Sequence, residues 1–116
     1  MNVEDISAET RFNVRKSGVT STQMRHLKQS SHHIELDLHG YTQAEARQRL
    51  HQYIEQTHSA YLNIIHGKGY HNPESVPVLK IMVYEYLMNQ PKVLAFCSAK
   101  SKDGGAGATY VLLKKE

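Results

Sequence analysis

The sequence predicts a two-layer α/β sandwich, in which a mixed four-stranded sheet carries both of its helices on one face. From Ile34 onward, segments with the periods of strands and helices follow one another in the order β-α-β-α-β-β. The connections between the first three strands are long enough for right-handed helical crossovers, which make these strands parallel. The first strand alternates apolar and polar residues, which indicates that helices cover only one sheet face there.

The first strand and the first helix have the clearest signals. Residues 34–39 (Ile-Glu-Leu-Asp-Leu-His) alternate between apolar and polar side chains, and Gly40 ends the strand. Thr42 and Glu45 have the spacing of a capping box, in which both side chains bond to free amide groups at the start of a helix. The helix is predicted to run to about His58, with an apolar face formed by Ala46, Leu50, Tyr53 and Ile54.

A second strand and a second helix follow. Residues 61–65 predict the strand, and the glycines and the proline of residues 66–73 predict a loop. The helix is expected to open near Ser75 and Pro77 and to stop at residues 89–91, Asn-Gln-Pro. Its buried stripe consists of Leu79, Met82, Val83, Tyr86 and Leu87.

Two further strands complete the predicted sheet. Residues 93–98 form a short apolar segment, and residues 108–113 form the last strand. The glycine-rich segment of residues 100–107 between them is too short for another helical crossover. The last strand is therefore predicted to be antiparallel to the third.

Residues 1–33 have a different composition from the rest of the chain. They are polar, contain few large apolar side chains, and show no sustained period. We expect a mostly disordered N-terminal tail with a short helix near residues 22–27, followed by one domain at residues 34–116. Most of the excess positive charge lies in this tail, which carries Arg11, Arg15, Lys16, Arg25 and Lys28 against Glu4, Asp5 and Glu9.

Length and composition limit the class of protein. A chain of 116 residues fits one domain, and its single cysteine, Cys97, excludes an intramolecular disulfide. The N-terminus has no apolar core of a signal peptide, and no apolar run has the length of a membrane span. We therefore expect a soluble cytoplasmic protein without a membrane partner. The net charge of +3 permits a nucleic-acid partner but does not by itself indicate one.

Two side chains near the end of the first strand are candidates for chemistry. Asp37 and His39 are two residues apart, so they share one face of the strand, with their Cβ atoms roughly 6 to 7 Å apart. A carboxylate at this distance can orient an imidazole ring or stabilise its charged form. A charged pair on a solvated strand has the same spacing, and spacing alone favours that structural explanation.

A glycine-rich segment follows the second strand. Its sequence is His66-Gly67-Lys68-Gly69, and it lies at the sheet edge where α/β proteins bind ligands. The glycines allow backbone amides to approach a ligand and Lys68 adds positive charge, a combination that suits phosphate. A turn that needs positive φ explains a lone Gly-x-Gly equally well. The functional interpretation gains weight because His66 lies at the same edge as His39.

A third segment, residues 104–109 (Gly-Gly-Ala-Gly-Ala-Thr), precedes the last strand. A flexible hairpin loop is its simplest explanation. In the functional interpretation, this loop lines the same open face and Thr109 supplies a hydroxyl group to the substrate.

Together the three segments resemble the motifs of the Smr (small MutS-related) domain family. The matching motifs are Asp37-Leu38-His39-Gly40 with Glu45-Ala46, His66-Gly67-Lys68-Gly69, and residues 104–109, in the order and spacing of the family. The resemblance covers residues 34–116. Many members continue the second motif with another Gly-x-Gly step, and this chain departs there at Tyr70-His71. One domain after a short N-terminal segment is most similar to the stand-alone bacterial members.

The resemblance implies a similar two-layer fold, nucleic-acid binding and, in many members, endonuclease activity. Some members nick DNA, others cleave messenger RNA on stalled or collided ribosomes, and not every member is an active nuclease. For this chain we expect RNA to be favoured over DNA, no cofactor to be required, and the tail to contact the ribosome. The candidate catalytic residues are Asp37, His39 and His66. The candidate contacts to nucleic acid are Gly67, Lys68, Gly69, Gly105, Gly107 and Thr109.

For an RNA substrate we predict cleavage by histidine acid/base chemistry. The 2′-hydroxyl is an internal nucleophile, His39 is the base with support from Asp37, and His66 is the acid or an electrostatic partner. Lys68 and the loop amides stabilise charge on the phosphate, and no metal site is needed. Strand alternation places His66 on the side of Leu62 and Ile64, however, and a buried His66 that points away from His39 could not be the acid.

Three other functions stay open at this point. A DNA-nicking endonuclease in repair or recombination would use Asp37 as a ligand of a divalent metal ion. A non-catalytic module would use the same face to bind a nucleic-acid backbone. A protein-interaction domain, whose tail anchors it to a ribosome or a repair complex, is a separate alternative.

Overall fold

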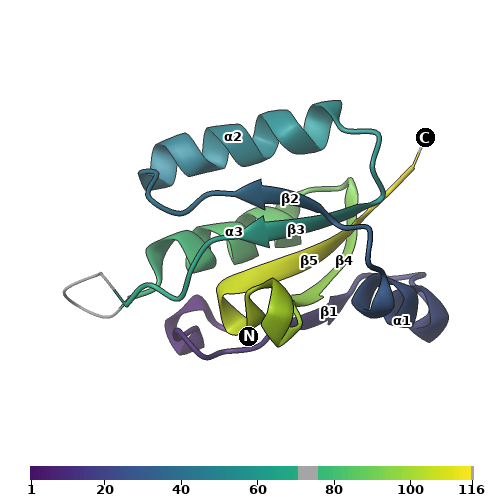
Figure 1. The fold of residues 1–116 in the computed structure, drawn as a ribbon, viewed down its shortest axis with the longest axis horizontal. Coiled ribbons are helices and arrows are strands. Elements are labelled where there is room, and N and C mark those ends of the chain that lie inside the picture. Colours follow the sequence, from purple (N-terminus) through teal and green to yellow (C-terminus); the bar gives the residue numbers. More distant parts are fainter. Residues whose placement is uncertain (71–75, 116) are drawn as a thin grey trace.

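The computed structural model describes residues 1–70 and 76–115, and within them the strands form one sheet (Figure 1). The strand order across the sheet is β1-β4-β5-β3-β2. The strands are β1 (Asn13–Arg15), β2 (Ile34–Asp37), β3 (Tyr61–Ile65), β4 (Val93–Ser98) and β5 (Ala108–Leu113). The α-helices are α1 (Ser21–Gln29), α2 (Gln43–Gln56) and α3 (Val78–Asn89).

The direction of the strands agrees with the sequence prediction, and the sheet contains one additional strand. β2 and β3 pair in parallel, while β5 is antiparallel to both β3 and β4. β2, β3 and β4 therefore run in the same direction, and the last strand is antiparallel to the third as predicted. The predicted four strands become five because β1 pairs with the outer edge of β4 in antiparallel orientation.

Helices α2 and α3 cover one face of the sheet, as predicted (Figure 1). The capping box of α2 is present, with the Thr42 side chain accepting from the Glu45 amide and the Glu45 side chain accepting from the Thr42 amide. Between these helices and the sheet lies the main core, which includes Leu38, Leu50, Ile64, Val83, Leu87 and Val111. Because α2 and α3 cover this face, the polar side chains of β2 lie on the opposite face of the sheet.

Residues 1–33 differ from the prediction of a mostly disordered tail. They contain a 3-10 helix (Val3–Asp5), β1 and α1, and Phe12 and Leu27 are buried. Helix α1 spans the predicted short helix and has its own capping box between Thr20 and Gln23. Each element here is short and places only one or two apolar side chains in the core. Such a segment does not show the repeated apolar positions by which a helix or strand is recognised in a sequence.

Helix α1 packs on the sheet face opposite α2 and α3, which the sequence did not predict. Met24 and Leu27 form a second, smaller core with side chains of β4 and β5: Ala95, Cys97, Ala108, Tyr110 and Leu112. This face is therefore covered near β4 and β5, and it is open at β2, where Glu35, Asp37 and His39 are exposed. In the described part of the chain, no helix is long and apolar enough to cross a membrane.

Candidate functional site

A cavity of about 700 Å³ lies beyond the carboxyl ends of β2 and β3. Three segments line it: residues 39–41 after β2, residues 65–70 after β3, and residues 76–80 at the start of α3. His71 and Ser75, which the sequence placed in this loop and at the helix start, lie outside the described residues. In parallel α/β units this edge is where ligands bind, so the cavity is the candidate site.

Asp37 and His39 form a close pair at the rim of this cavity. Oδ1 of Asp37 accepts hydrogen bonds from Nδ1 of His39 at 2.5 Å and from the His39 backbone amide at 3.0 Å. The Leu38 amide bonds to the Ile65 carbonyl at 2.8 Å, which extends the pairing of β2 with β3 to this point. Asp37 therefore holds the ring by Nδ1, and Nε2 of His39 is left as the proton-accepting atom in the neutral ring.

Both members of this pair are solvent-exposed. The side chain of His39 is 73% exposed and that of Asp37 is 42% exposed. The strand predicted over residues 34–39 ends at Asp37, so His39 lies in the turn that follows, and the two side chains contact each other there. An exposed imidazole with a free Nε2 can reach a polymer that lies across the open face of the sheet.

His66 has the opposite surroundings. It is 4% exposed, and burial lowers its pKa to about 4, so the ring is neutral at pH 7. Its Nδ1 contacts the Gly67 carbonyl at 2.8 Å and its Nε2 contacts Oγ1 of Thr109 at 2.9 Å. Because a carbonyl oxygen only accepts, Nδ1 carries the proton and the Thr109 hydroxyl donates to Nε2.

This geometry does not support His66 as a general acid. A group with a pKa of about 4 carries a proton in roughly one molecule in a thousand at pH 7, and both ring nitrogens already have partners within the protein. Strand alternation is the cause, because it turns His66 toward the covered side of the sheet with Leu62 and Ile64. His66 instead fixes the start of the glycine loop.

Thr109 and the glycine-rich segment of residues 104–107 contact the start of the loop that follows β3. Thr109 is fully buried and its hydroxyl is engaged with His66, so it does not offer a hydroxyl to substrate as the sequence suggested. The Gly107 carbonyl accepts from the amides of His66 (3.1 Å) and Gly67 (2.8 Å). Neither Gly105 nor Gly107 lines the cavity. Gly107 and Thr109 therefore hold the start of the glycine loop in place, and Gly105 makes no hydrogen bond to that loop within the described part of the chain.

Lys68 reaches the cavity but also contacts the N-terminal segment. Gly67, Lys68 and Gly69, the candidate contacts to nucleic acid in this loop, all line the cavity. The Lys68 ammonium group lies 2.9 Å from Oε1 of Glu9, and the Tyr70 hydroxyl also donates to Glu9. Hydrogen bonds from Tyr70 and Lys68 hold the pKa of Glu9 below its ordinary value. Sequence reasoning missed Glu9 because its partner lies far away in the chain.

Lys80 is a second cation of the cavity that the sequence analysis did not identify. It is 1% exposed, and its ammonium group donates to the carbonyls of Ala8 (3.0 Å) and Thr10 (2.5 Å). Burial lowers its pKa to about 8. The signal was present in the sequence, because Lys80 precedes Val83, Tyr84 and Leu87 by three, four and seven residues and so shares their helix face.

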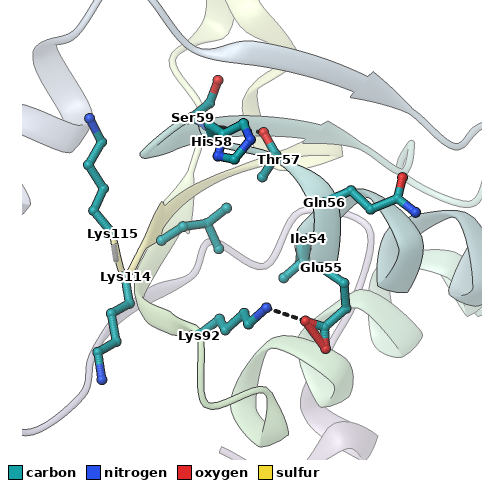
Figure 2. A pocket seen from close by; sticks show the side chains of 10 residues that line it. Ile54, Glu55, Gln56, Thr57, His58, Ser59, Lys92, Lys114 and Lys115 are labelled. Atoms are coloured by element: carbon teal, nitrogen blue, oxygen red, sulfur yellow. Dashed lines mark hydrogen bonds and ion pairs between the residues drawn. The ribbon is translucent and has the colours of Figure 1, made fainter.

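Another hollow lies at the opposite end of the sheet, beside the C-terminus (Figure 2). It is lined by residues 54–59, Lys92 and residues 113–115, and Lys92 forms an ion pair with Glu55. No side chain that the sequence singled out for catalysis or nucleic-acid binding lines this hollow. The cavity beside His39 therefore remains the candidate site.

Comparison with known proteins gives consistent matches. The model of the Smr domain matches residues 36–114. Endonuclease MutS2 of Carboxydothermus hydrogenoformans is 34% identical over 104 residues, which cover 87% of this chain and 12% of that protein. Ribosome rescue factor SmrB of Shewanella sp. (strain ANA-3) is 34% identical over 101 residues, which cover 83% of this chain and 54% of SmrB. The chain spans about half or less of the length of these curated relatives.

Two solved structures have the same fold. YdaL, a stand-alone small MutS-related protein from Escherichia coli, superposes with a TM-score of 0.84 at 25% identity and covers 97% of this chain and 90% of YdaL. The Smr domain of Thermus thermophilus MutS2 superposes with a TM-score of 0.61 at 32% identity and covers 70% of this chain and 98% of that domain. The likeness to YdaL includes most of the N-terminal segment, which the family model does not reach.

Proposed function

Because this chain belongs to the Smr domain family, we propose that it binds nucleic acid and cleaves it as an endonuclease. The observation that carries the proposal is the Asp37–His39 pair, which holds an exposed imidazole with a free Nε2 at the rim of a cavity. The same cavity offers Lys68 and the backbone of a glycine loop to a phosphate group. We propose RNA as the preferred substrate, because its 2′-hydroxyl supplies a nucleophile that this pair can activate without any other group.

In the proposed reaction, Nε2 of His39 removes the proton of the 2′-hydroxyl. The 2′ oxygen then forms a bond to the adjacent phosphorus, and the bond from phosphorus to the 5′ oxygen of the next nucleotide breaks. The products are a 2′,3′-cyclic phosphate and a 5′-hydroxyl. The leaving oxygen takes its proton from solvent, and His39 returns its proton to solvent. The carboxylate of Asp37 keeps the ring oriented and stabilises its charged form during this step.

Lys68 and the backbone amides of residues 68 and 69 provide the charge stabilisation, whereas the Gly67 amide already donates to the Gly107 carbonyl. Negative charge accumulates on the non-bridging phosphate oxygens as the new bond forms, and an ammonium group and oriented amides nearby lower the energy of that state. His66 has a positioning role here, because it is neutral and fixes the loop that presents these groups.

We propose further that the cellular substrate is messenger RNA associated with a ribosome. The name of the SmrB relatives, ribosome rescue factor, supports this assignment. Residues 1–33 remain the proposed ribosome contact, although they are packed into the fold. Deleting them would remove Phe12 and Leu27 from the two cores, so single surface substitutions are the suitable test of that contact.

The experiment that tests the proposed function compares single-stranded RNA with supercoiled DNA, each with EDTA and with magnesium. The wild-type protein should cleave RNA in EDTA and leave 5′-hydroxyl ends, and His39→Ala should lower the rate by about 10²- to 10⁴-fold. His58→Ala is the matched control, because this exposed histidine lines the hollow at the other end of the sheet (Figure 2).

Two results would contradict the RNA mechanism. Magnesium-dependent nicking of DNA with 5′-phosphate ends would favour a DNA endonuclease, in which Asp37 contributes to a metal site; the name of the MutS2 relative supports this second candidate. Binding without cleavage of either polymer would favour a non-catalytic nucleic-acid-binding module.

A further inference from the structure

A groove on the sheet face opposite α2 and α3 carries a concentration of positive charge. Two adjoining hollows that share Asn13 and Lys28 form it, between β1, the end of β4 and helix α1. Its lining includes five cationic side chains, all of them exposed: Arg11, Arg15, Arg25, Lys28 and Lys100. No aspartate or glutamate is among the residues that line either hollow. We call these five residues and Asn13 the basic groove.

The fold arranges four of these cations in two rows, and Lys100 follows the end of β4. Arg11, Asn13 and Arg15 follow one another at every second position along β1 and the residues before it, so their side chains point to one face with a spacing of roughly 6 to 7 Å. Arg25 and Lys28 are three residues apart on α1 and so are neighbours on the helix surface. The groove therefore has a cationic wall on each side.

These charges are not neutralised within the described part of the chain. None of the five groups takes part in an ion pair there. Arg11 donates to the carbonyls of Ser98 and Ala99, and the other four residues are solvent-exposed. Five unpaired cations around one groove repel one another, and this repulsion is relieved when an anionic chain lies between them.

We propose that the basic groove binds the phosphodiester backbone of a single RNA strand, away from the site of cleavage. This inference rests on the proposed function and adds a second contact surface to it. A groove with cationic walls that follows the backbone is typical of proteins that bind single-stranded nucleic acid. The aromatic side chains of the groove, Phe12 and Tyr110, are buried, so the bases cannot stack on them. Binding should therefore depend on charge and not on base sequence.

The distance between the groove and His39 sets the length of RNA that can use both. β1 and β2 are the two edges of the sheet, four strand spacings apart, which corresponds to about 19 Å. The groove lies beside β1 at one edge, and exposed His39 lies in the turn after β2 at the other edge. A strand of several nucleotides can span this distance, whereas a dinucleotide at His39 cannot.

The test measures binding and cleavage separately. Arg15→Gln, Arg25→Gln and Lys28→Gln are combined in one variant, and binding of a fluorescent single-stranded RNA longer than about 16 nucleotides is followed by anisotropy. For binding, the variant and its reference both carry His39→Ala, so the RNA is not cut. Each lost phosphate contact lowers the salt slope by about 0.7, so we expect a slope smaller by about 2 and an affinity about 50-fold weaker at 0.15 M salt.

A charge-matched variant provides the control. Arg47→Gln, Lys114→Gln and Lys115→Gln remove three exposed cations that lie outside the groove, on α2 and after β5, and this variant should keep the reference affinity. Arg15→Lys with Arg25→Lys should also keep it, because the charge is retained. If the groove variant binds RNA with the affinity and salt slope of the control, the proposal is overturned.

Cleavage of a dinucleotide separates this proposal from the proposed function. With His39 intact, the groove variant should cleave a dinucleotide at the wild-type rate and lose activity on the long RNA alone. If dinucleotide cleavage falls by the same factor, the substitutions act through the fold and the groove is not a separate binding surface. If the wild-type protein cleaves neither RNA, the proposed function fails, while the anisotropy result still decides whether the groove binds RNA.

Discussion

The Thr109 hydroxyl donates a hydrogen bond to Nε2 of His66 over 2.9 Å, and this contact connects β5 to the glycine loop that follows β3. Both side chains are buried, and Nδ1 of His66 donates to the Gly67 carbonyl. The imidazole is therefore neutral, in one tautomer, and fully hydrogen-bonded within the protein. It holds the start of the glycine loop that contains Gly67 and Lys68.

Replacing Thr109 with valine should lower the stability of the protein. Valine has nearly the same shape, but it leaves Nε2 of His66 without a donor in a buried position, which costs about 1–3 kcal/mol. Urea unfolding of Thr109→Val and Thr109→Ser measures this cost, and the serine variant should retain most of the stability because its hydroxyl can still donate. Equal stability of the valine variant and the wild type would mean that the bond does not contribute.

The stability of the protein should decrease between pH 6.5 and pH 4 because of His66. Its folded-state pKa is about 4, whereas a histidine in the unfolded chain titrates near 6.5, so the unfolded state binds more protons in this window. The loss should be on the order of 3 kcal/mol. Unfolding free energies of the wild type and of His66→Gln, measured across this range, isolate the effect. A difference between the two proteins that does not change with pH would contradict it.

The regular part of this fold follows from local patterns in the sequence. The strands at residues 61–65, 93–98 and 108–113 are predicted with the bounds that the structure has, because each is a short apolar segment between glycine, proline or polar residues. The turn of His66 toward the covered face also follows from strand alternation. These features depend on neighbours in the sequence, which periodicity can detect.

Other features depend on contacts between distant segments. Residues 13–15 form a strand because β4 offers a free edge, and the insertion of β5 between β3 and β4 leaves no signal in either strand. Likewise, Glu9 lies beside Lys68 in a segment whose Ala8 and Thr10 carbonyls accept hydrogen bonds from the distant Lys80. Periodicity cannot identify such partners, so the N-terminal segment was predicted to be a tail.

Asp37→Asn should reduce RNA cleavage by about 10²- to 10⁴-fold while the protein remains folded. The carboxylate accepts from Nδ1 of His39 and so leaves Nε2 free to take a proton, whereas an asparagine amide can donate to Nδ1 and place the proton on Nε2. Glu35→Gln is the matched control, because Glu35 is an exposed carboxylate two residues earlier on the same strand face. If both variants lose activity equally, the effect reflects the charge of the strand and not the orientation of His39.

The two glycines of the loop should differ in their tolerance of alanine. Gly67 and Gly69 both have positive φ, at +78° and +80°, which costs an L-residue about 1–2 kcal/mol. A Cβ atom at Gly67 meets open space, whereas a Cβ atom at Gly69 would lie 2.5 Å from Cα of Pro77. Gly69→Ala should therefore lower the unfolding free energy more than Gly67→Ala in urea titrations. Equal losses of unfolding free energy in the two variants would show that Pro77 and the start of α3 can shift to accommodate the new Cβ atom without loss of stability.

Glu9→Gln should strengthen the binding of RNA. The Glu9 carboxylate lies on the ammonium group of Lys68 and accepts from the Tyr70 hydroxyl, so it occupies the place that a phosphate group would take. Removing its charge frees Lys68 for one additional phosphate contact, which is worth about a fourfold gain in affinity at 0.15 M salt and about 0.7 in the salt slope. Anisotropy with labelled single-stranded RNA measures both quantities in the His39→Ala background.

Glu4→Gln is the control for Glu9→Gln. It removes the same charge from an exposed position of the same segment, without a contact to Lys68 in the described residues. A general effect of net charge would raise the affinity equally in both variants. An increase confined to Glu9→Gln would instead mean that RNA must displace a carboxylate of the protein to reach Lys68. Unchanged affinity in Glu9→Gln would show that Lys68 does not contact the phosphate backbone.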